Sequence, residues 1–485
     1  MKGNIIDRAI GMFNPKWGLS RLAYRRSYEA ASYGRRSKSL SGASSTGPNL
    51  EITQSFQTLR NRSRHLVRNN GWQKRALGVV ADNTIGIGIR PAPVGTRNQI
   101  KKIKQIWANW AETTDCDWYG KHTFYGLQRL IMSEVAESGD CLIIRRKIIP
   151  EYPGQLPIKL QVLEGDQLDH NRNYKLSVKI KGKTVEGYAR LGVQYDDEDR
   201  ILGYWVWPRH PYDMTPVIQT IQSKFIPKED VIHPFEILRA GQVRGVPMGV
   251  ATYMKTSDFS DYEDAQLMRQ KVAACFAAFV SGSSELTDEQ SIESIEPGVI
   301  EYLRNDETIT FANPPKADGY DEYSRKILQG IAAGWEITYE QLTMDYSNVN
   351  FTSGRMGKID ASGRTKHLQY NIFIPQVCVP VWRWFMESVQ ISGKMSSWID
   401  CNPMSWTAPR VQQLDPVKET NALIAQLNAG LTTLSEVLRE NGDDPDDVFE
   451  EMRVEREKLQ EMGINLSAIP FAPDFTNDKN KEKDE

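Results

Sequence analysis

Apolar residues recur at helical spacing in the first part of the chain and predict four helices. In the first of them, Phe56, Leu59 and Leu66 share one face. The run Asn69-Asn70-Gly71 then stops this helix, because Asn and Gly favour the backbone conformations of helix ends. The other three helices are expected at about 72–82, 99–112 and 124–137.

Short apolar runs replace the helical spacing between residues 140 and 235. They are rich in Ile, Val, Leu, Tyr and Trp, which is typical of β-strands. The runs are CLIIRRKII, IKLQVLEGDQL, YKLSVKI, TVEGYARLGVQY and ILGYWVWP. Turn residues separate them, so this part predicts a β-rich domain with the helices packed in front of it.

Helical spacing returns after this domain. One long helix is expected at 248–280, with an acidic first half, and a second helix at 320–335. A compact segment with the strand-like runs GVIEYLR and TITFANPP lies between them, at 281–318. The three together predict a projecting arm with too little core to stand alone, which neighbouring copies in a ring would stabilise.

The rest of the chain is predicted to be mostly helical. A polar loop at 336–354 leads into a helix that continues past Pro375 and Pro380. Three further helices are expected at about 416–430, 431–440 and 446–462.

Composition narrows the function classes only slightly. The length of 485 residues suggests two to four domains, and 40% apolar residues are enough to build sizeable cores. Proteins that coat duplex DNA usually carry a strong basic excess, whereas the net charge here is −2, so no broad DNA-binding face is predicted. Near-neutrality suits a channel in which DNA slides, and it equally suits an ordinary enzyme.

The two ends differ in composition from the rest. Residues 16–48 mix Arg and Lys with Ser, Gly and Tyr, which predicts a flexible basic arm or simply a solvated terminus. The charged tail TNDKNKEKDE is expected to be disordered. The five cysteines lie far apart, which favours reduced thiols in a cytoplasmic protein. No signal-peptide core and no apolar run of about 18–20 residues is found, so no membrane span is expected.

Two glycine motifs suggest phosphate binding but lack required positions. Gly182-Lys183-Thr184 would need a further glycine where Ser177 stands, and it lies between two predicted strands, so a hairpin turn is expected. Gly86-Ile87-Gly88-Ile89 lacks the third glycine of a dinucleotide fingerprint and precedes Arg90-Pro91, where no helix can open.

Metal and catalytic patterns are equally weak. The acidic run Asp196-Asp197-Glu198-Asp199 could bind a metal, but adjacent carboxylates in a turn are usually just solvated. The six histidines show no ligand spacing, and neither GxSxG nor HExxH occurs. No catalytic residue, metal site or cofactor is therefore predicted.

A set of longer stretches follows in a fixed order between about residues 20 and 463. They are LRNRSRHLVRNNGWQKRALGVVADNTIGIGIRP, AESGDCLIIRR, LQVLEGDQLD, GVQYDDEDRILGYWVWPRHP, VIHPFEILRAGQVRGVPMGVATYM, IEPGVIEYLRNDETITFANPP, IAAGWEITYEQLTMDYSNVNFTSGR and DPVKETNALIAQLNAGLTTLSEVLRENGDDPDDVFEE. Taken in this order, they resemble the lambda-type portal proteins of bacteriophages.

The resemblance implies an α+β portal-protein fold with a β-rich wing, long stem helices, a small α/β clip and a helical crown. The expected division is an N-terminal arm at 1–50, the wing at 51–244, stem helices at 245–280 and 320–336, the clip at 281–319, a tunnel loop at 337–354, the returning wing with its long helix at 355–404, the crown at 405–463 and a tail at 464–485.

Candidate functional residues follow from this division. Tyr346, Asn348 and Asn350 of the tunnel loop would touch passing DNA, or would only cap and turn the loop. Arg355 and Lys358 would anchor the loop or contact a neighbouring subunit. The stem candidates for the channel wall are Asp258, Asp261 and Glu263, which could also face solvent or pair with a neighbour. The clip candidates for docking are Glu285, Asp288, Glu289, Glu293 and Glu296.

The resemblance also implies partners and a place of action. The chain would form a ring of twelve subunits at one capsid vertex of the virion, assembled in the host cytoplasm, for DNA packaging and ejection. Its partners would be further copies of itself, double-stranded DNA, the terminase large subunit, a neck or head-completion protein and the major capsid protein, and it would be no enzyme.

Two other classes stay open from the residues alone. A metal-dependent nucleic-acid-processing enzyme would use the acidic runs and the Arg-rich helix at 60–75, and it would turn over with a divalent metal. A scaffold protein would assemble without a central hole.

Overall fold

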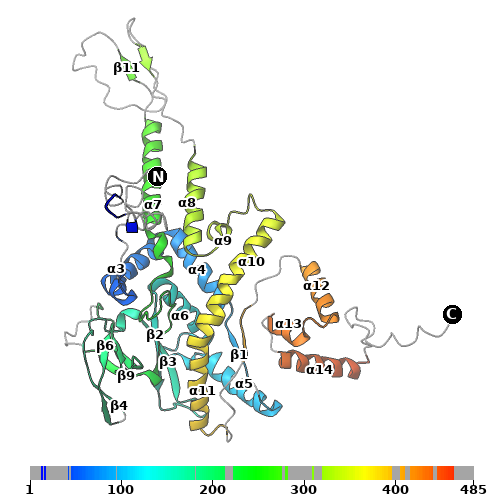
Figure 1. Ribbon diagram of the computed structural model, residues 1–485. Coiled ribbons are helices and arrows are strands. Elements are labelled where there is room, and N and C mark those ends of the chain that lie inside the picture. Colours follow the sequence, from blue (N-terminus) through cyan, green and yellow to red (C-terminus); the bar gives the residue numbers. More distant parts are fainter. Residues whose placement is uncertain are drawn as a thin grey trace, which may run out of the picture. The chain divides into compact units, whose positions relative to one another are not determined.

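The computed structural model describes residues 12–14, 16–17, 42, 45–93, 95–180, 182–213, 222–275, 279–281, 308–310, 319–395, 405–409, 416–440 and 445–463. The chain separates into two compact units, 1–51 and 52–485. Most of the predicted basic arm and the whole charged tail lie outside the described residues. The fold below is that of the second unit (Figure 1).

The four N-terminal helices are present as predicted. They are α3 (Pro48–Asn69), α4 (Gly71–Ile85), α5 (Arg97–Ala111) and α6 (Phe124–Ser138). Asn70 both ends α3 and caps α4, because its side-chain oxygen accepts hydrogen bonds from the N–H groups of Trp72 and Gln73. Gly139 ends α6 with a φ of 92°, a backbone angle that residues with a side chain rarely adopt.

The predicted β-rich region forms small antiparallel sheets. A three-stranded sheet has the order β10-β2-β3 (Val231–Ile232, Cys141–Lys147 and Ile158–Glu164). A four-stranded sheet has the order β6-β7-β8-β9 (Tyr188–Arg190, Val193–Tyr195, Ile201–Val206 and Lys224–Pro227). β4 (Val178–Ile180) and β5 (Lys183–Val185) form a hairpin in which Ile180 pairs with Lys183, so the GKT sequence is a turn as predicted.

The long helix is shorter than predicted. A 3-10 turn, η6 (Met248–Thr252), precedes α7 (Tyr253–Cys275). Gly249 in this turn lies so close to the Trp335 indole that a Cβ atom there would be 2.4 Å from it. At the other end Phe279–Ser281 is already strand β11, paired with β12 (Thr308–Thr310). β-Branched and aromatic residues in both segments favour this strand pair over further helix.

α8 (Tyr320–Gly334) returns beside α7, as predicted (Figure 1). The Tyr262 ring of α7 lies 4.6 Å from the Tyr323 ring of α8, measured between centroids. Gln73 of α4 donates hydrogen bonds to the hydroxyls of Thr252 and Thr256, so the base of the helix pair is fixed on α4.

A nearly continuous helix runs from Phe351 to Ile391 and confirms that neither proline ends it. It consists of α10 (Phe351–His367), a π-helical segment (Leu368–Cys378) and α11 (Val379–Ile391). Pro375 lies in the π-helical segment, where the backbone already departs from the α-helical hydrogen-bond pattern. Pro380 lies in the first turn of α11, where an N–H group is not needed.

The C-terminal part adds a strand and three helices. β13 (Ser405–Thr407) pairs antiparallel with β1 (Arg90–Ala92). The helices are α12 (Pro416–Asn428), α13 (Leu434–Glu440) and α14 (Pro445–Glu461), close to their predicted positions.

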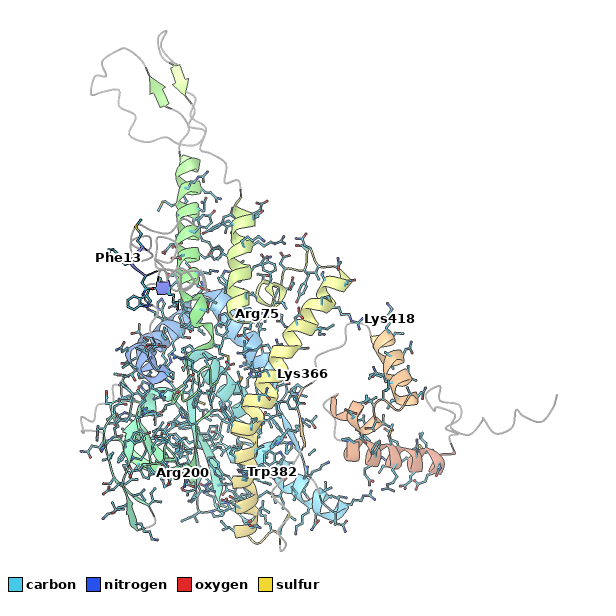
Figure 2. All side chains as sticks on the ribbon, viewed as in Figure 1. Phe13, Arg75, Arg200, Lys366, Trp382 and Lys418 are labelled. Carbon is cyan, nitrogen blue, oxygen red and sulfur yellow. The ribbon has the colours of Figure 1, made fainter. Side chains whose placement is uncertain are left out.

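Two hydrophobic clusters hold these elements together. In the larger one, Trp107 of α5 lies 4.8 Å from Phe385 and 5.1 Å from Trp382, ring centroid to ring centroid, and both partners belong to α11 (Figure 2). The smaller cluster joins α3 to the sheets through Phe56, Leu142 and Leu168. Helices and small antiparallel sheets sharing these cores make an α+β fold, as expected.

Candidate functional site

The loop at 337–354 contains a short helix, α9 (Tyr339–Thr343), that was not predicted. Thr338 caps it by accepting a hydrogen bond from the N–H of Gln341 (3.2 Å), while the Gln341 side chain accepts one from the N–H of Thr338 (3.2 Å). Arg75 of α4 donates to the Gln341 carbonyl (3.0 Å), which ties α9 to α4 (Figure 2).

Asp345 fixes the loop beyond α9. Its carboxylate accepts hydrogen bonds from the Ser347 hydroxyl (2.5 Å), the Ser347 N–H (3.0 Å) and the Tyr339 hydroxyl (3.3 Å). Arg325 of α8 approaches it to 3.4 Å. The Ser347 hydrogen bonds, and then these partners, lower the pKa of Asp345 below its ordinary value. The loop is therefore attached to α8 through an ionised side chain.

The three tunnel-loop candidates have different surroundings. Tyr346 is 63% exposed, and the Asn348 amide donates only to the neighbouring Ser347 hydroxyl (3.3 Å). Asn350 is the N-cap of α10, since its side-chain oxygen accepts a hydrogen bond from the N–H of Ser353 (2.8 Å). Tyr346 and Asn348 are thus presented to the surroundings, whereas Asn350 already holds the start of a helix.

The two basic candidates follow on α10. Arg355 is exposed and Lys358 is half-buried. Further along, Arg364 binds both carboxylate oxygens of Glu236 (2.7 and 2.9 Å) and one of Glu336 (2.7 Å). Arg364 therefore connects α10 to the segment before η6 and to the end of α8, a role that the sequence did not indicate.

The three stem acids do not share one environment. Asp258 and Asp261 are exposed on α7, three residues apart and so on the same face of the helix. Glu263 is half-buried and faces α8, where the Tyr320 hydroxyl lies 3.4 Å from its carboxylate. The structure thus brings Asp258 and Asp261 together and separates Glu263 from them.

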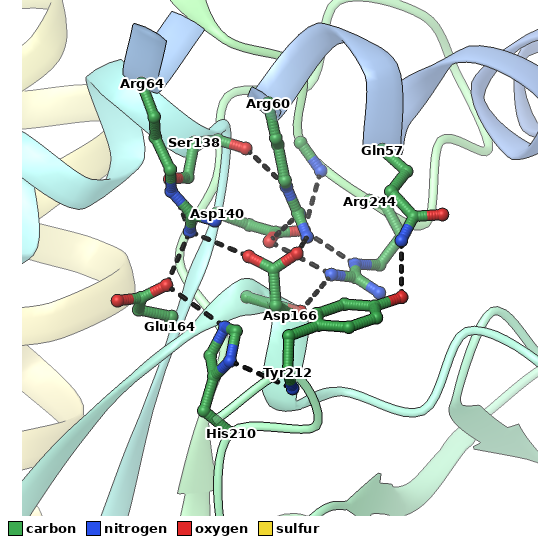
Figure 3. A network of polar contacts seen from close by, with 12 residues as sticks. Gln57, Arg60, Arg64, Ser138, Asp140, Glu164, Asp166, His210, Tyr212 and Arg244 are labelled. Carbon is green, nitrogen blue, oxygen red and sulfur yellow. Dashed lines mark hydrogen bonds and ion pairs between the residues drawn. The ribbon is translucent and has the colours of Figure 1, made fainter. Parts of the chain in front are cut away.

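A buried ion network joins α3 to the sheets (Figure 3). Asp140 is its centre: Arg244 donates two hydrogen bonds to it (2.6 and 3.2 Å), and Arg60 donates another. All three side chains are fully buried. Burial alone would raise the pKa of Asp140, but Arg244 and Arg60 outweigh burial and hold the pKa well below 3.8.

Two neighbours complete the network around Asp140. His233 lies 3.2 Å from its carboxylate and is also buried, and burial lowers the pKa of this imidazole. A Cβ atom at Gly165 would lie 2.1 Å from Asp140, so only glycine fits beside the carboxylate. The network therefore depends on a small residue as well as on the charges.

A second group of charges lies next to it (Figure 3). Glu164, Asp166 and His210 have ligand atoms within 4.8 Å of one another, and they form the one such group found among the described residues. The guanidinium of Arg64 lies 2.7 Å from both carboxylates, so a fixed cation already takes the place that a metal ion would need. This group is therefore an ion-pair cluster around Arg64, and it does not support a metal site.

The acidic run between β7 and β8 also has a structural role. Asp196 accepts hydrogen bonds from the N–H groups of Glu198 (2.9 Å) and Arg200 (2.8 Å), and Asp199 has a φ of 61°. This is an Asx-type turn, so Asp196 has a structural role in it.

Comparison with known proteins decides the family. The model of the lambda family of phage portal proteins matches residues 33–369, more than half of the chain. The chain belongs to the lambda family of phage portal proteins. The match includes the loop at 337–354 and the helices α7 and α8, and membership places the chain among the structural proteins of phages.

Individual phage portal proteins are similar over nearly the whole length. The probable portal protein of Halomonas phage phiHAP-1 is 25% identical over 471 residues, which cover 90% of this chain and 88% of that protein. Portal protein B of Escherichia phage lambda and the portal protein of Escherichia phage N15 are each 21% identical, covering 84% of this chain and 85% of theirs.

Solved structures give a weaker similarity. The neck of an empty gene transfer agent particle, computed with C6 symmetry, has a chain that is 14% identical with a TM-score of 0.48, covering 85% of this chain and 99% of that one. The corresponding C12 neck of the native particle is 13% identical with a TM-score of 0.46 and has the same coverage. TM-scores below 0.5 do not by themselves define a common fold.

The clip candidates Glu285, Asp288, Glu289, Glu293 and Glu296 lie outside the described residues. Among the described residues, no helix combines the length and apolar character that crossing a membrane requires. Sequence reasoning missed the ion network and Arg364, because a charged residue gives no sign in the sequence of whether it will be buried. Asp140, Arg60 and Arg244 are far apart in the chain, so no local pattern connects them.

Proposed function

We propose that the chain assembles into a closed ring with a central channel, through which DNA enters and leaves a phage head at one vertex. The supporting observation is membership of the lambda portal family over residues 33–369. The arm formed by α7, the β11–β12 pair and α8 fits this role, because two helices bury little surface by themselves and neighbours in a ring would cover the rest.

Imaging the purified chain tests this proposal. Electron microscopy and mass photometry should show closed rings, with twelve subunits in the assembled particle and a hole wide enough for a duplex about 20 Å across. Rings should form without nucleotide or metal. A stable monomer at micromolar concentration under every salt condition, or an assembly without a hole, would contradict the proposal.

The chain would form the DNA channel and would not itself hydrolyse ATP to move the DNA. Lys183 lies in a hairpin, Arg60 is fully buried, and Arg64 takes the metal position beside Glu164 and Asp166, so the features that favoured a nucleic-acid-processing enzyme have structural roles. Isolated rings should therefore show neither ATPase nor nuclease activity with Mg²⁺ or Mn²⁺. Turnover that disappears on Lys183→Ala or Asp197→Ala would refute this.

The partners of the ring would meet it at its ends. The acidic segment 285–296 of the clip would dock the terminase large subunit and later a neck protein by steering basic surfaces toward it. The outer part of the ring would contact the major capsid protein in the virion, after assembly in the host cytoplasm. Reversing the five clip charges should leave rings intact and abolish terminase binding; unchanged binding would remove this segment from the docking site.

The loop at 337–354 would border the DNA path. It is attached at both ends, through Asp345 to α8 and through Asn350 to α10, so it can extend into a channel and keep its shape. Tyr346 and Asn348 are the side chains that it presents. The stem acids stay a weaker candidate for the channel wall, since Glu263 faces α8.

A further inference from the structure

An exposed stripe runs along α7. Its members repeat at intervals of four and three residues, which places them on one face of the helix. They are Met254, Asp258, Asp261, Ala265 and Met268, all of them exposed. Met254 and Met268 are 66% and 61% exposed, so the stripe ends in a large apolar side chain on both sides of an acidic centre. Fourteen residues of helix span about 21 Å.

A matching stripe runs along α10. It repeats the same intervals over the same length and consists of Thr352, Met356, Ile359, Gly363 and Lys366, all exposed. Lys366 is labelled in Figure 2. Met356 and Ile359 are 62% and 57% exposed. A Cβ atom at Gly363 would meet no atom within 4 Å, so the space above this stripe is open.

α10 receives little support from its own chain. Its sequence, FTSGRMGKIDASGRTKH, has three glycines, and glycine is the poorest helix former after proline. Of its described side chains only Thr365 is buried. A helix of this composition is normally stabilised by packing against another element, and glycine at an exposed position permits a close approach of that element.

The two stripes complement each other in charge. Asp258 and Asp261 give the α7 stripe an acidic centre, with Asp264 beside it. Lys366 lies on the α10 stripe and Arg355 directly beside it, and both are exposed, with Asp360 as the one acidic residue of that helix. Equal length, equal spacing and opposite charge are the features that let two helices pack side by side.

Both helices are fixed to the same element within one chain. The start of α4 binds α7 through Gln73 and Thr256, and the end of α4 binds the segment after α10, because Gln369 donates to the Thr84 carbonyl (2.9 Å). The two stripes are therefore held at a fixed angle to each other. A contact between two different patches repeats from copy to copy, and a fixed angle can close such a series into a ring.

We propose that the α7 stripe of one subunit packs against the α10 stripe of the next subunit. Asp258 and Asp261 then face Arg355 and Lys366 of the neighbouring copy, while the methionines and Ile359 bury their apolar surface. This inference rests on the proposed ring and names the surfaces that build it. It assigns Asp258 and Asp261 to the subunit contact instead of the channel wall.

Charge reversal tests the contact. The first variant is Asp258→Lys with Asp261→Lys, the second is Arg355→Glu with Lys366→Glu, and the third combines all four changes. Each two-site variant places like charges opposite each other, so the fraction of chains in rings should fall on the order of tenfold at the concentration where half of the parent is assembled. The four-site variant restores opposite charges and should recover ring formation.

Mixing and controls separate folding from assembly. In an equimolar mixture of the two two-site variants, alternating subunits have complementary charges at every contact, so rings should return. The matched control is Glu451→Lys with Glu455→Lys on α14, which changes the net charge as much as the first variant and should assemble like the parent. Far-ultraviolet circular dichroism checks that each variant is folded.

The outcomes distinguish the two proposals. If the parent forms no rings, the proposed function fails and this contact fails with it. If the parent forms rings and either two-site variant assembles equally well, or if neither the mixture nor the folded four-site variant recovers, only the contact is wrong. Rings of the second variant that assemble normally but lose DNA would show that the α10 stripe faces DNA instead.

Discussion

At the scale of single residues, two arginines of α3 form ion pairs inside the protein instead of a charged surface. Arg60 and Arg64 lie one helical turn apart in a run, RNRSR, that in sequence resembles a surface for nucleic acid. In the structure Arg60 is fully buried and forms an ion pair with Asp140. Arg64 forms ion pairs with Glu164 and Asp166. Sequence periodicity cannot distinguish a buried arginine from an exposed one, because it shows which residues share a helix face and not what that face packs against.

Asp140→Asn should be among the most destabilising single changes in this region. The amide has nearly the same size but leaves Arg244 buried without its counter-charge and Arg60 with only Asp166, at 3.9 Å. Breaking a buried ion pair in this way typically costs about 3–5 kcal/mol. Thermal and urea unfolding measure this loss, with Asp197→Asn in the exposed turn as the control that should change little. Since the pKa of folded Asp140 lies below 3.8, its contribution is present above that pH and disappears as the pH falls toward the folded value. A variant as stable as the parent at pH 7 would mean that the network is not needed.

Glu134 should show the opposite pH dependence. Burial, and then the nearby Glu164, raises its pKa to about 7 from 4.5. A raised folded pKa gives stability that is complete below pH 4.5 and lost as the pH rises through about 7. The free energy of unfolding of Glu134→Gln should therefore rise relative to that of the parent between pH 5 and pH 8. The rise should be on the order of 1–2 kcal/mol, since Glu134 is partly exposed. Urea unfolding at pH 5 and pH 8 measures this change, with Glu322→Gln on α8 as the control. A difference between parent and variant that stays constant with pH would contradict the prediction.

At the scale of elements, the sequence predicted most helices and strands, and its errors have identifiable causes. The helical spacing at 248–280 predicts one long helix, yet its first residues form the 3-10 turn η6, where Gly249 packs on Trp335, and its last residues pair as strand β11 with β12. The helix α9 was missed although Thr338 and Gln341 form a capping box that is visible in the sequence. The first two causes are tertiary contacts between residues far apart in the chain, which local patterns do not contain.

In the loop at 337–354, different residues cap a helix and are exposed for contact with DNA, so the two roles can be tested separately. Asn350→Ala removes the N-cap of α10 and should cost about 1 kcal/mol, whereas Asn350→Ser should retain most of it. Tyr346→Ala with Asn348→Ala removes exposed side chains and should leave the melting temperature and ring assembly unchanged, yet reduce the DNA packaged or retained by heads. Differential scanning fluorimetry and the DNA content of heads measure the two effects. Heads of the double variant that fill and hold DNA like the parent would exclude the loop from the DNA path.

At the scale of the whole molecule, family membership was evident from ordered sequence stretches, while the subunit surfaces were not. Asp258 and Asp261 look like channel acids when only their charge is considered. Their place in a stripe with Met254 and Met268 becomes visible once the exposed face of α7 is known. Whether such a face meets solvent, DNA or another copy depends on the assembly, and a single chain sequence contains that information only indirectly.

The assembled ring should hold DNA with little dependence on salt. Lys and Arg that neutralise phosphates release counterions, and each such contact steepens the dependence of log affinity on log salt by about 0.9. The loop sequence from Ile337 to Gly354 contains neither residue, and the chain carries a net charge of −2, so a slope magnitude below about 1 is expected for a short duplex bound in the channel. Tyr346→Arg with Asn348→Arg should steepen the slope by roughly one for each phosphate newly contacted, and should slow packaging, because a passage that holds DNA more tightly lets it slide less freely. Fluorescence anisotropy across a salt series measures the slope, with the single change Glu451→Arg on α14 as a control that alters the net charge by the same amount. A steep slope in the parent would mean that basic side chains line the DNA path, and that the loop at 337–354 does not border it.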